Sequence, residues 1–383
     1  MTDKQAKIFG LSIIRAAAIF ALAVMITWIL IVGKSILQPF VVAMLLFLFI
    51  TSLANVFARI KIAGKGLPVG LPTLLAFIII FGAVVVVISV FVSVSISELI
   101  SKWEGYKEVV TKMVGDLDGW AVVHLQKITG RSFDIDSTGP VVEALNSINV
   151  SGLVTRFQQA LSNAASFFGL MFLFLVFLVL EQRVFHRKLD ALFPDGKQRS
   201  NIDEILLHIR EGVFSYLQVK TFISALTGIA TYAILRLFKV DFAEFWAVLT
   251  FILNYIPNIG SFLAVVLTSI AALVQLNPMT VGVLFICLTA VQQFLGGYLD
   301  PKISGDRLNL SPLVIIFALV FWGKIWGILG AFFCVPLTAM MNIILANFKS
   351  TRPVAILLSS KGYIFSDKDK EEAEDSDKLS NPE

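Results

Sequence analysis

Polar and backbone-breaking residues lie together in the middle of a long apolar stretch of this chain. They are Asn254, Tyr255, Pro257, Asn258 and Gly260. Proline removes a backbone donor, glycine permits unusual dihedral angles, and an asparagine amide both donates and accepts hydrogen bonds. Backbone groups freed in hydrocarbon are tolerated only inside protein or beside water. The segment therefore predicts either a proline kink satisfied by neighbouring helices or a broken, re-entrant helix that lines a polar cavity. Its density of polar atoms favours the broken helix.

The last apolar block is interrupted as well, by Gly323, Lys324, Gly327, Gly330 and Pro336. Lys324 is the one charged residue of that block. It is either a lysine that snorkels from a short turn at the membrane surface or a functional cation inside the membrane. The glycines would allow close helix contacts. Two interrupted blocks are typical of the discontinuous helices of secondary transporters.

Between these blocks, Gln292 and Gln293 are polar residues in an otherwise apolar crossing. They are either hydrogen-bond partners between helices or groups that line a cavity. Titratable carboxylates border the apolar spans, and those that could couple ions or protons are Glu211, Asp241, Glu244, Asp300 and Asp306. A cation/proton antiporter requires a titratable carboxylate in the membrane. The small number of such groups disfavours that class.

Composition sets the class of protein to which these residues belong. Of the 383 residues, 57% are hydrophobic and 15% charged, and the mean hydropathy is +0.84. No charged residue lies between Phe245 and Leu299. About 20 apolar residues cross a bilayer as a helix. We therefore expect an all-α polytopic membrane protein with about eight transmembrane segments, two of them broken or re-entrant, plus an extracytoplasmic helical segment. An ordinary soluble enzyme and a disordered protein are excluded.

Several kinds of chemistry have no support in the sequence. Cys287 and Cys334 fall in apolar segments with no second ligand nearby, so no metal site, cofactor or disulfide is expected. The net charge of +4 combines an acidic tail with basic residues that sit beside apolar spans, which does not indicate a nucleic-acid partner. No nucleophile–base pair and no phosphate loop is present, so no catalytic residue is assigned and an ATP-driven pump is disfavoured.

The polar segment 98–156 begins with an amphipathic helix, expected from Glu98 to Thr129. Apolar residues from Leu99 to Trp120 recur every three or four positions. This helix packs on its own outer subdomain, contacts a second subunit or captures substrate. A second apolar stripe, from Ile202 to Val213, predicts a helix that lies along the membrane surface before it turns into the fifth span.

Five ordered motifs between Glu211 and Leu345 resemble those of the autoinducer-2 exporter (AI-2E) family of bacterial membrane proteins. They are Asn254–Gly260, Gln292-Gln293, Pro301-Lys302-Ile303 with Gly305, Leu308 and Leu310, Ser311–Val314, and Trp326–Gly330 with Val335-Pro336-Leu337. Two positions depart from the family pattern. Lys220, one third of the way into the fifth span, stands where the family often has Gln, and Ser311 stands where His is common.

The resemblance implies export or facilitated passage of a small molecule across a bacterial inner membrane. Some members of the family are linked to the signal autoinducer-2 and others to sodium(lithium)/proton antiport, and the family suggests a homo-oligomer, reported as a pentamer. The expected partners are therefore membrane lipid, a small solute and further copies of the chain. Three hypotheses follow: a transporter of a small polar solute such as autoinducer-2, an antiporter, and a non-transporting membrane scaffold.

The charged segments divide the chain into six expected parts, with both termini in the cytoplasm. They are three spans in 1–97, the extracytoplasmic segment 98–156, a fourth span in 157–180, a cytoplasmic amphipathic segment in 181–212, a transport core with broken helices in 213–348, and a cytoplasmic, largely disordered acidic tail in 349–383. Each broken block is either a hairpin that enters and leaves on one side or a set of ordinary spans.

Overall fold

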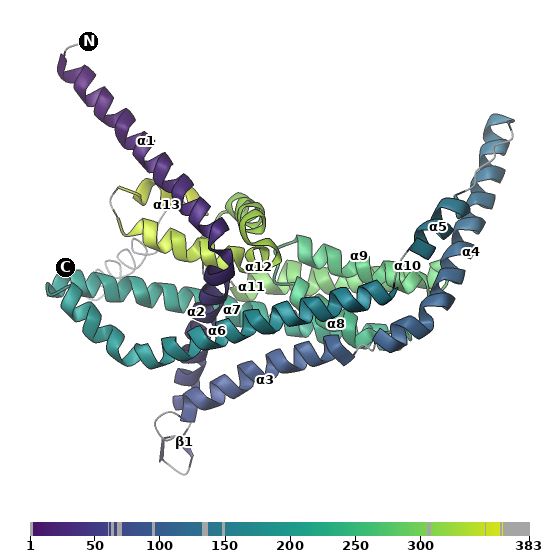
Figure 1. Cartoon of the computed structure of the whole chain (residues 1–383), viewed down its shortest axis with the longest axis horizontal. Coiled ribbons are helices and arrows are strands. Elements are labelled where there is room, and N and C mark those ends of the chain that lie inside the picture. The colour runs from purple at the N-terminus through teal and green to yellow at the C-terminus, as the bar shows by residue number, and fades with distance from the viewer. Residues whose placement is uncertain are drawn as a thin grey trace, which may run out of the picture. The chain divides into compact units, whose positions relative to one another are not determined.

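The computed structural model consists almost entirely of helices (Figure 1). It describes residues 3–59, 61–62, 65–66, 71–93, 96–131, 137–147, 150–304, 308–348, 350–360 and 362. The expected tail beyond residue 362 and Asp306 lie outside these residues. The elements are α1 Asp3–Val32, α2 Lys34–Ala58, β1 Lys61–Ile62, β2 Lys65–Gly66, α3 Leu71–Ser93, α4 Ile96–Thr129, α5 Thr138–Ser147, α6 Val150–Leu192, α7 Gly196–Leu237, α8 Ala243–Leu253, α9 Ile259–Leu273, α10 Pro278–Gln292, the π-helix η1 Gln293–Leu299, α11 Asp300–Ser304, α12 Pro312–Ala346 and α13 Arg352–Leu358.

Five of the described helices are long and apolar enough to cross a membrane. They are Lys34–Ala58, Ser162–Gln182, Gly196–Leu237, Pro278–Ile303 and Pro312–Ala346. Shorter apolar helices occupy Phe20–Val32, Leu71–Gly82, Ala243–Leu253 and Ile259–Leu273. These helices confirm the expected all-α polytopic membrane fold. Exposed apolar side chains cover them, as a lipid-facing surface requires (for example Phe20, Trp28 and Phe177).

The chain forms two compact units. Unit 1 comprises residues 1–76, 166–218 and 304–383, and unit 2 comprises 77–165 and 219–303. The polar helix α4 belongs to unit 2 and begins and ends within two residues of its expected bounds. The short helix α5 packs on α4, where the Ser137 amide donates to the Asp118 carboxylate at 2.8 Å.

One expected break is absent. The amphipathic residues from Ile202 to Val213 do not form a separate surface helix, because α7 continues from Gly196 to Leu237 without interruption. The sequence offers no Gly or Pro between them and the span that could end the helix, apart from Gly212. Gly212 faces Leu308 and Ile343 of the same unit, so it serves a close packing contact within a continuous helix.

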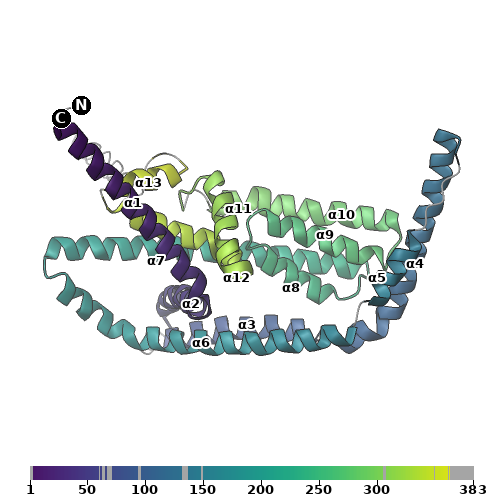
Figure 2. The same ribbon diagram turned by 45° about the horizontal axis from the view of Figure 1, so that its top comes forward.

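The first broken block is a helical hairpin in unit 2. Its arms are α8 and α9, and α10 packs on α9, so that the three helices lie side by side (Figure 2). At 1.5 Å per residue the arms are about 16 and 22 Å long, less than the hydrocarbon thickness of a bilayer. The two ends of the hairpin meet, because the Asp241 amide before α8 donates to the Gln275 side chain after α9 at 2.6 Å.

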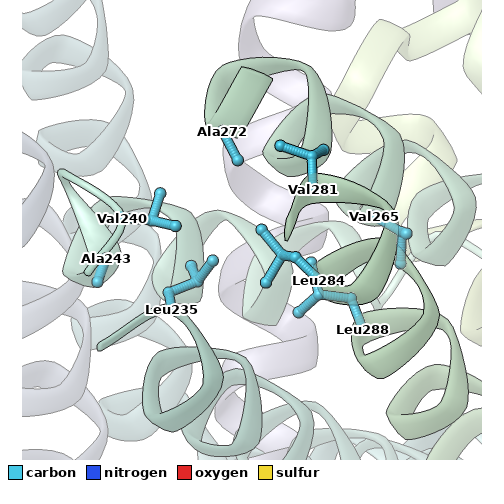
Figure 3. Packing of buried hydrophobic residues seen from close by; sticks show 8 residues of the cluster. All are labelled: Leu235, Val240, Ala243, Val265, Ala272, Val281, Leu284 and Leu288. Atoms are coloured by element: carbon cyan, nitrogen blue, oxygen red, sulfur yellow. The ribbon is translucent and has the colours of Figure 1, made fainter. Parts of the chain in front are cut away.

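The core of unit 2 joins this hairpin to its neighbours (Figure 3). Leu235 at the end of α7 and Leu284 of α10 are fully buried, and Val265 and Ala272 of α9 belong to the same cluster. The cluster is completed by Val240, Ala243, Val281 and Leu288. Because all four helices contribute, apolar packing holds the hairpin along its length.

The second broken block is also a hairpin, within unit 1. Gly327 interrupts α12 with φ 65° and ψ −141°, a conformation that favours glycine. The Trp322 indole donates to the Thr338 hydroxyl at 3.1 Å, although 16 residues separate them. A straight helix would place those residues about 24 Å apart. The Ser311 amide at the start of α12 donates to the Leu358 carbonyl at the end of α13, so α13 packs back on α12. Both broken blocks therefore fold back on themselves as hairpins, and entry and exit on one side of the membrane stays a prediction.

Candidate functional site

Asn254 is the centre of the polar contacts at the tip of the first hairpin. Its side chain is 1% exposed. The amide nitrogen Nδ2 donates to Ser224 Oγ of α7 at 3.1 Å, and the oxygen Oδ1 accepts from Ser261 Oγ of α9 at 3.0 Å. A buried amide that is satisfied on both sides joins three elements at a defined point.

Tyr255 and Gln292 extend this network. The hydroxyls of Tyr255 and Thr221 lie 2.7 Å apart, which ties the tip to α7 a second time. Gln292 Nε2 of α10 donates to the Ser261 carbonyl at 3.4 Å. The structure therefore brings Asn254, Tyr255 and Gln292 together around α7 and Ser261.

Asn258 and Gln293 do not join that network. Both side chains are exposed. Asn258 instead adopts φ 57° and ψ −50° at the hairpin turn, close to the geometry of a γ-turn, and the Ile259 amide donates across it to the Pro257 carbonyl at 2.6 Å. The structure therefore places the Asn258 and Gln293 side chains outside the network around Asn254, and their role in solute binding stays a prediction.

Four buried polar atoms on α9 and α10 have no hydrogen-bond partner among the described residues. They belong to Thr268, Ser269, Thr289 and Gln292 (its Oε1). A buried polar group without a partner costs about 1–3 kcal/mol, so such groups need an explanation. We call these four residues, together with Asn254 and Ser261, the polar seam. A polar solute or water that enters unit 2 would find unused hydrogen-bonding capacity there.

Pro257 and Gly260 shape the turn. The turn between α8 and α9 starts after Leu253, and a Cβ at Gly260 would lie 1.7 Å from the Leu253 carbonyl oxygen. Glycine is thus required for the two arms to approach each other. The Ile256 carbonyl accepts from the Gly260 amide at 3.2 Å, so the break leaves few backbone groups unpaired.

The second break also depends on a glycine at the point where the two arms approach each other. A Cβ at Gly330 would lie 1.9 Å from the Trp322 carbonyl oxygen, and Gly323 faces Ala331 across the hairpin. Lys324 is exposed, which agrees with a lysine at a surface turn. Pro336 is buried in the second arm.

The tip of this hairpin is held by the N-terminal helices of unit 1. The break at Gly327 frees the carbonyl of Trp326, and Gln38 Nε2 of α2 donates to it at 3.0 Å. The Trp326 indole donates to the Leu30 carbonyl at 3.1 Å. Sequence reasoning missed Gln38, because nothing local indicates a partner 288 residues away.

The carboxylates expected to couple ions lie at different places. Asp300 pairs with Lys220 at 2.9 Å. Asp241 pairs with Lys102 of α4 at 2.9 Å and accepts from Tyr106 at 3.0 Å. Glu244 accepts from Tyr232 at 3.3 Å, and Glu211 is exposed. Among the described residues, these four carboxylates do not form one ion site. The sequence did not predict that Lys220 pairs with Asp300. A lysine within an apolar span did indicate that it needs a partner of opposite charge.

Comparison with known proteins gives the family. The model of the family described as AI-2E family transporter matches residues 18–350. The "Putative transport protein" of Borreliella burgdorferi is 35% identical over 238 residues, which are 59% of this chain and 66% of that protein. A protein of the same name from Haemophilus influenzae is 32% identical over 66% of this chain and 71% of its own length. The AI-2 transport protein TqsA of Escherichia coli is 35% identical over 54% of this chain and 59% of its own. Because the family model covers most of the chain, the chain belongs to the AI-2E family of transporters.

Proposed function

We propose that this protein is a secondary transporter that moves a small polar solute across the membrane, and that the polar seam of unit 2 is its solute pathway. The observation that carries the proposal is the set of unpaired buried polar atoms on α9 and α10. In a protein that spans a bilayer, such groups are retained where a cavity, water or ligand satisfies them.

The chemistry of the seam favours a neutral, hydroxyl-rich solute. Its side chains are amides and hydroxyls, which exchange hydrogen bonds with hydroxyl groups without requiring a charge. The nearby charged groups Lys220 and Asp300 neutralise each other. Autoinducer-2 is such a solute, and the printed name of the TqsA relative supports it as the first compound to test. Membrane lipid and further copies of this chain are the proposed partners.

The test is flux in liposomes that contain the purified protein. Labelled autoinducer-2 uptake is measured with and without an imposed proton or sodium gradient. Gln292→Leu removes the unpaired Oε1 and one long hydrogen bond, so it should abolish saturable flux and leave folding intact. Gln293→Leu, at the exposed neighbour, is the matched control and should retain flux. Equal flux in both variants would remove the seam from the pathway.

A cation/proton antiporter is the second candidate function, and the Lys220–Asp300 pair is the observation in its favour. A partly buried carboxylate next to an ammonium group is a place where proton and cation binding can compete. Sodium-triggered proton movement in the same liposomes would support it. An unchanged signal after neutralisation of Glu211, Asp241, Glu244, Asp300 and Asp306 would exclude it.

A further inference from the structure

The second half of the amphipathic helix α4 exposes large apolar side chains. Leu117 and Trp120 are each 61% exposed, and Ile128 is 79% exposed. These residues and His124 follow one another at steps of three or four, so they share one face of the helix, which we call the outer stripe. The Trp120 and His124 rings stack on each other with their centroids 4.3 Å apart. A grouped apolar surface outside the membrane spans marks a contact with another surface.

The short helix α5 does not cover the outer stripe. It packs on α4 where Asp118 accepts from the Ser137 amide at 2.8 Å and where a Cβ at Gly115 would face Thr138. Successive residues are about 100° apart around a helix, so Gly115 and Asp118 lie on another side of α4 than Leu117. Packing on α5 therefore leaves the outer stripe open.

The outer stripe continues the face by which α4 contacts the first hairpin. Tyr106 donates to Asp241, next to the base of that hairpin, at 3.0 Å. Val110 and Met113 lead from Tyr106 to Leu117 at steps of three or four residues, so these positions share one face. This face is half-buried at Val110 and Met113 and exposed from Leu117 onwards.

The direction of α4 places this face towards the bilayer. Within unit 2, α4 runs steeply across the direction of α9 and α10, as both views show (Figure 1, Figure 2). The helix α10 belongs to the stretch Pro278–Ile303, which is long and apolar enough to span a membrane. A helix that contacts the base of the hairpin and runs across a span lies along the membrane surface. The face that touches the hairpin base is then the face turned towards the lipid.

The charge of α4 changes along its length in a way that fits anionic lipid. Residues 98–118 carry five acidic residues and three lysines, whereas residues 119–131 carry Lys127 and Arg131 and no acidic residue. Both bases lie on the Trp120 side of the stripe, because they follow Trp120 by about two and three helical turns. Amphipathic helices with tryptophan and basic residues bind the headgroup region of anionic bilayers. Two copies of the same basic stretch would instead repel each other.

We propose that the outer stripe of α4 lies in the headgroup region of the bilayer that holds this protein, with Lys127 and Arg131 bound to the phosphates of anionic lipids. The apolar side chains then leave water, and the two cations lie at the level of the headgroups. This contact holds α4, and with it the Asp241 end of the first hairpin, at a fixed depth. It does not depend on which solute the protein moves.

Fluorescence quenching by lipid tests the contact directly. Single cysteines at Ile128, in the stripe, and at Gln126, on the opposite side of α4, are placed in a background with Cys287 and Cys334 replaced. Each carries the same environment-sensitive fluorophore, and the full chain is embedded in lipid nanodiscs of phosphatidylcholine with phosphatidylglycerol. The quenchers are a lipid with a nitroxide near the top of its acyl chain and, from the water, iodide.

The two positions should respond in opposite ways. The lipid nitroxide should quench the fluorophore at Ile128→Cys at least about twofold more strongly than that at Gln126→Cys, because only the stripe faces the bilayer. Iodide should show the reverse order. Equal quenching of the two positions by lipid would overturn the proposal. A fluorophore at Ile128→Cys that neither quencher reaches would also overturn it, since a second copy of the chain would then cover the stripe.

The charge of the lipid gives a second readout. In the Ile128→Cys protein, Lys127→Gln should lower quenching by the lipid nitroxide about twofold when phosphatidylglycerol is present. Lys112→Gln, at an exposed lysine of α4 outside the stripe, is the matched control and should have no effect. Quenching that is the same with and without phosphatidylglycerol would overturn the proposal, as would equal effects of the two substitutions.

Discussion

Asn254 shows how a single buried side chain fixes the tip of the first hairpin. It donates to Ser224 and accepts from Ser261, and it is almost completely buried. Asn342 in α12 is buried as well, but its Oδ1 has no partner among the described residues. We therefore expect the loss of Asn254 to lower stability and the loss of Asn342 to have almost no effect on it.

We predict that Asn254→Leu lowers the free energy of unfolding by about 1–3 kcal/mol, because it leaves the hydroxyls of Ser224 and Ser261 without their partner. Asn342→Leu removes an unsatisfied group and should change stability by less than about 0.5 kcal/mol. Chemical denaturation in detergent compares both with the wild type. Equal losses would mean that the contacts of Asn254 contribute no net stability.

At the scale of elements, both hairpins depend on a glycine where the arms approach. Gly260→Ala would bring a methyl group to 1.7 Å from the Leu253 carbonyl oxygen, so the arms must separate. We predict a loss of about 3 kcal/mol or more, as expected for strain in a closely packed site, together with loss of flux. Gly282→Ala on α10 is the control, since nothing lies within 4 Å of its Cβ. A Gly260→Ala protein as stable as Gly282→Ala would contradict the close approach of α8 and α9.

A second element-scale feature is the clasp between α4 and the loops that flank the first hairpin. Lys102 pairs with Asp241, whose backbone amide reaches Gln275, and Lys102 Nζ also lies 5.4 Å from the centroid of the Phe242 ring. Asp241 therefore links the amphipathic helix to both ends of the hairpin. These contacts give Asp241 a structural role, and the coupling role expected from its position at a span border stays a prediction.

The side chains of this clasp are about one third exposed, so its contribution is screened by water. Lys102→Met should cost about 0.2–1 kcal/mol, and a double-mutant cycle with Asp241→Asn should return a coupling energy in that range. Lys107→Met, which breaks only the pair with Glu104 inside α4, is the control for a lost lysine. A coupling energy of zero would show that the clasp does not hold α4.

The sequence predicts the elements that have a local sequence signal. The period of apolar residues predicts the bounds of α4 to within two residues, and Pro257 and Gly260 predict the position of the first break. It could not decide between kink, span and hairpin, because that choice depends on contacts such as Asp241 with Gln275. The Lys220–Asp300 pair and the π-helix before it have no local signature, since the partners lie 80 residues apart.

At the scale of the whole molecule, these contacts constrain which segments share one side of the membrane. Within unit 2, Lys102 of the polar segment 98–156 contacts Asp241 before the first hairpin, and Asp241 contacts Gln275 after it. We therefore predict that all three lie on the same side of the membrane, because charged and polar groups in contact with one another are not expected on opposite faces of the hydrocarbon layer. The positive residues of the short loops predict that this side is extracytoplasmic.

Cysteine labelling in intact cells tests this arrangement. Single cysteines are placed at Ser137, Met279, Leu192 and Leu357, all exposed positions, in a background with Cys287 and Cys334 replaced. A membrane-impermeant maleimide should label Ser137→Cys and Met279→Cys from outside, and Leu192→Cys and Leu357→Cys only after lysis. The first hairpin then returns to the side from which it entered, so α10 has to carry the chain inward.

Labelling of Ser137→Cys and Met279→Cys from opposite sides would mean that α8 and α9 together cross the membrane, against the Asp241–Gln275 contact. Labelling of all four positions in the inverted sense would keep the hairpin and reverse only the orientation read from the basic loops.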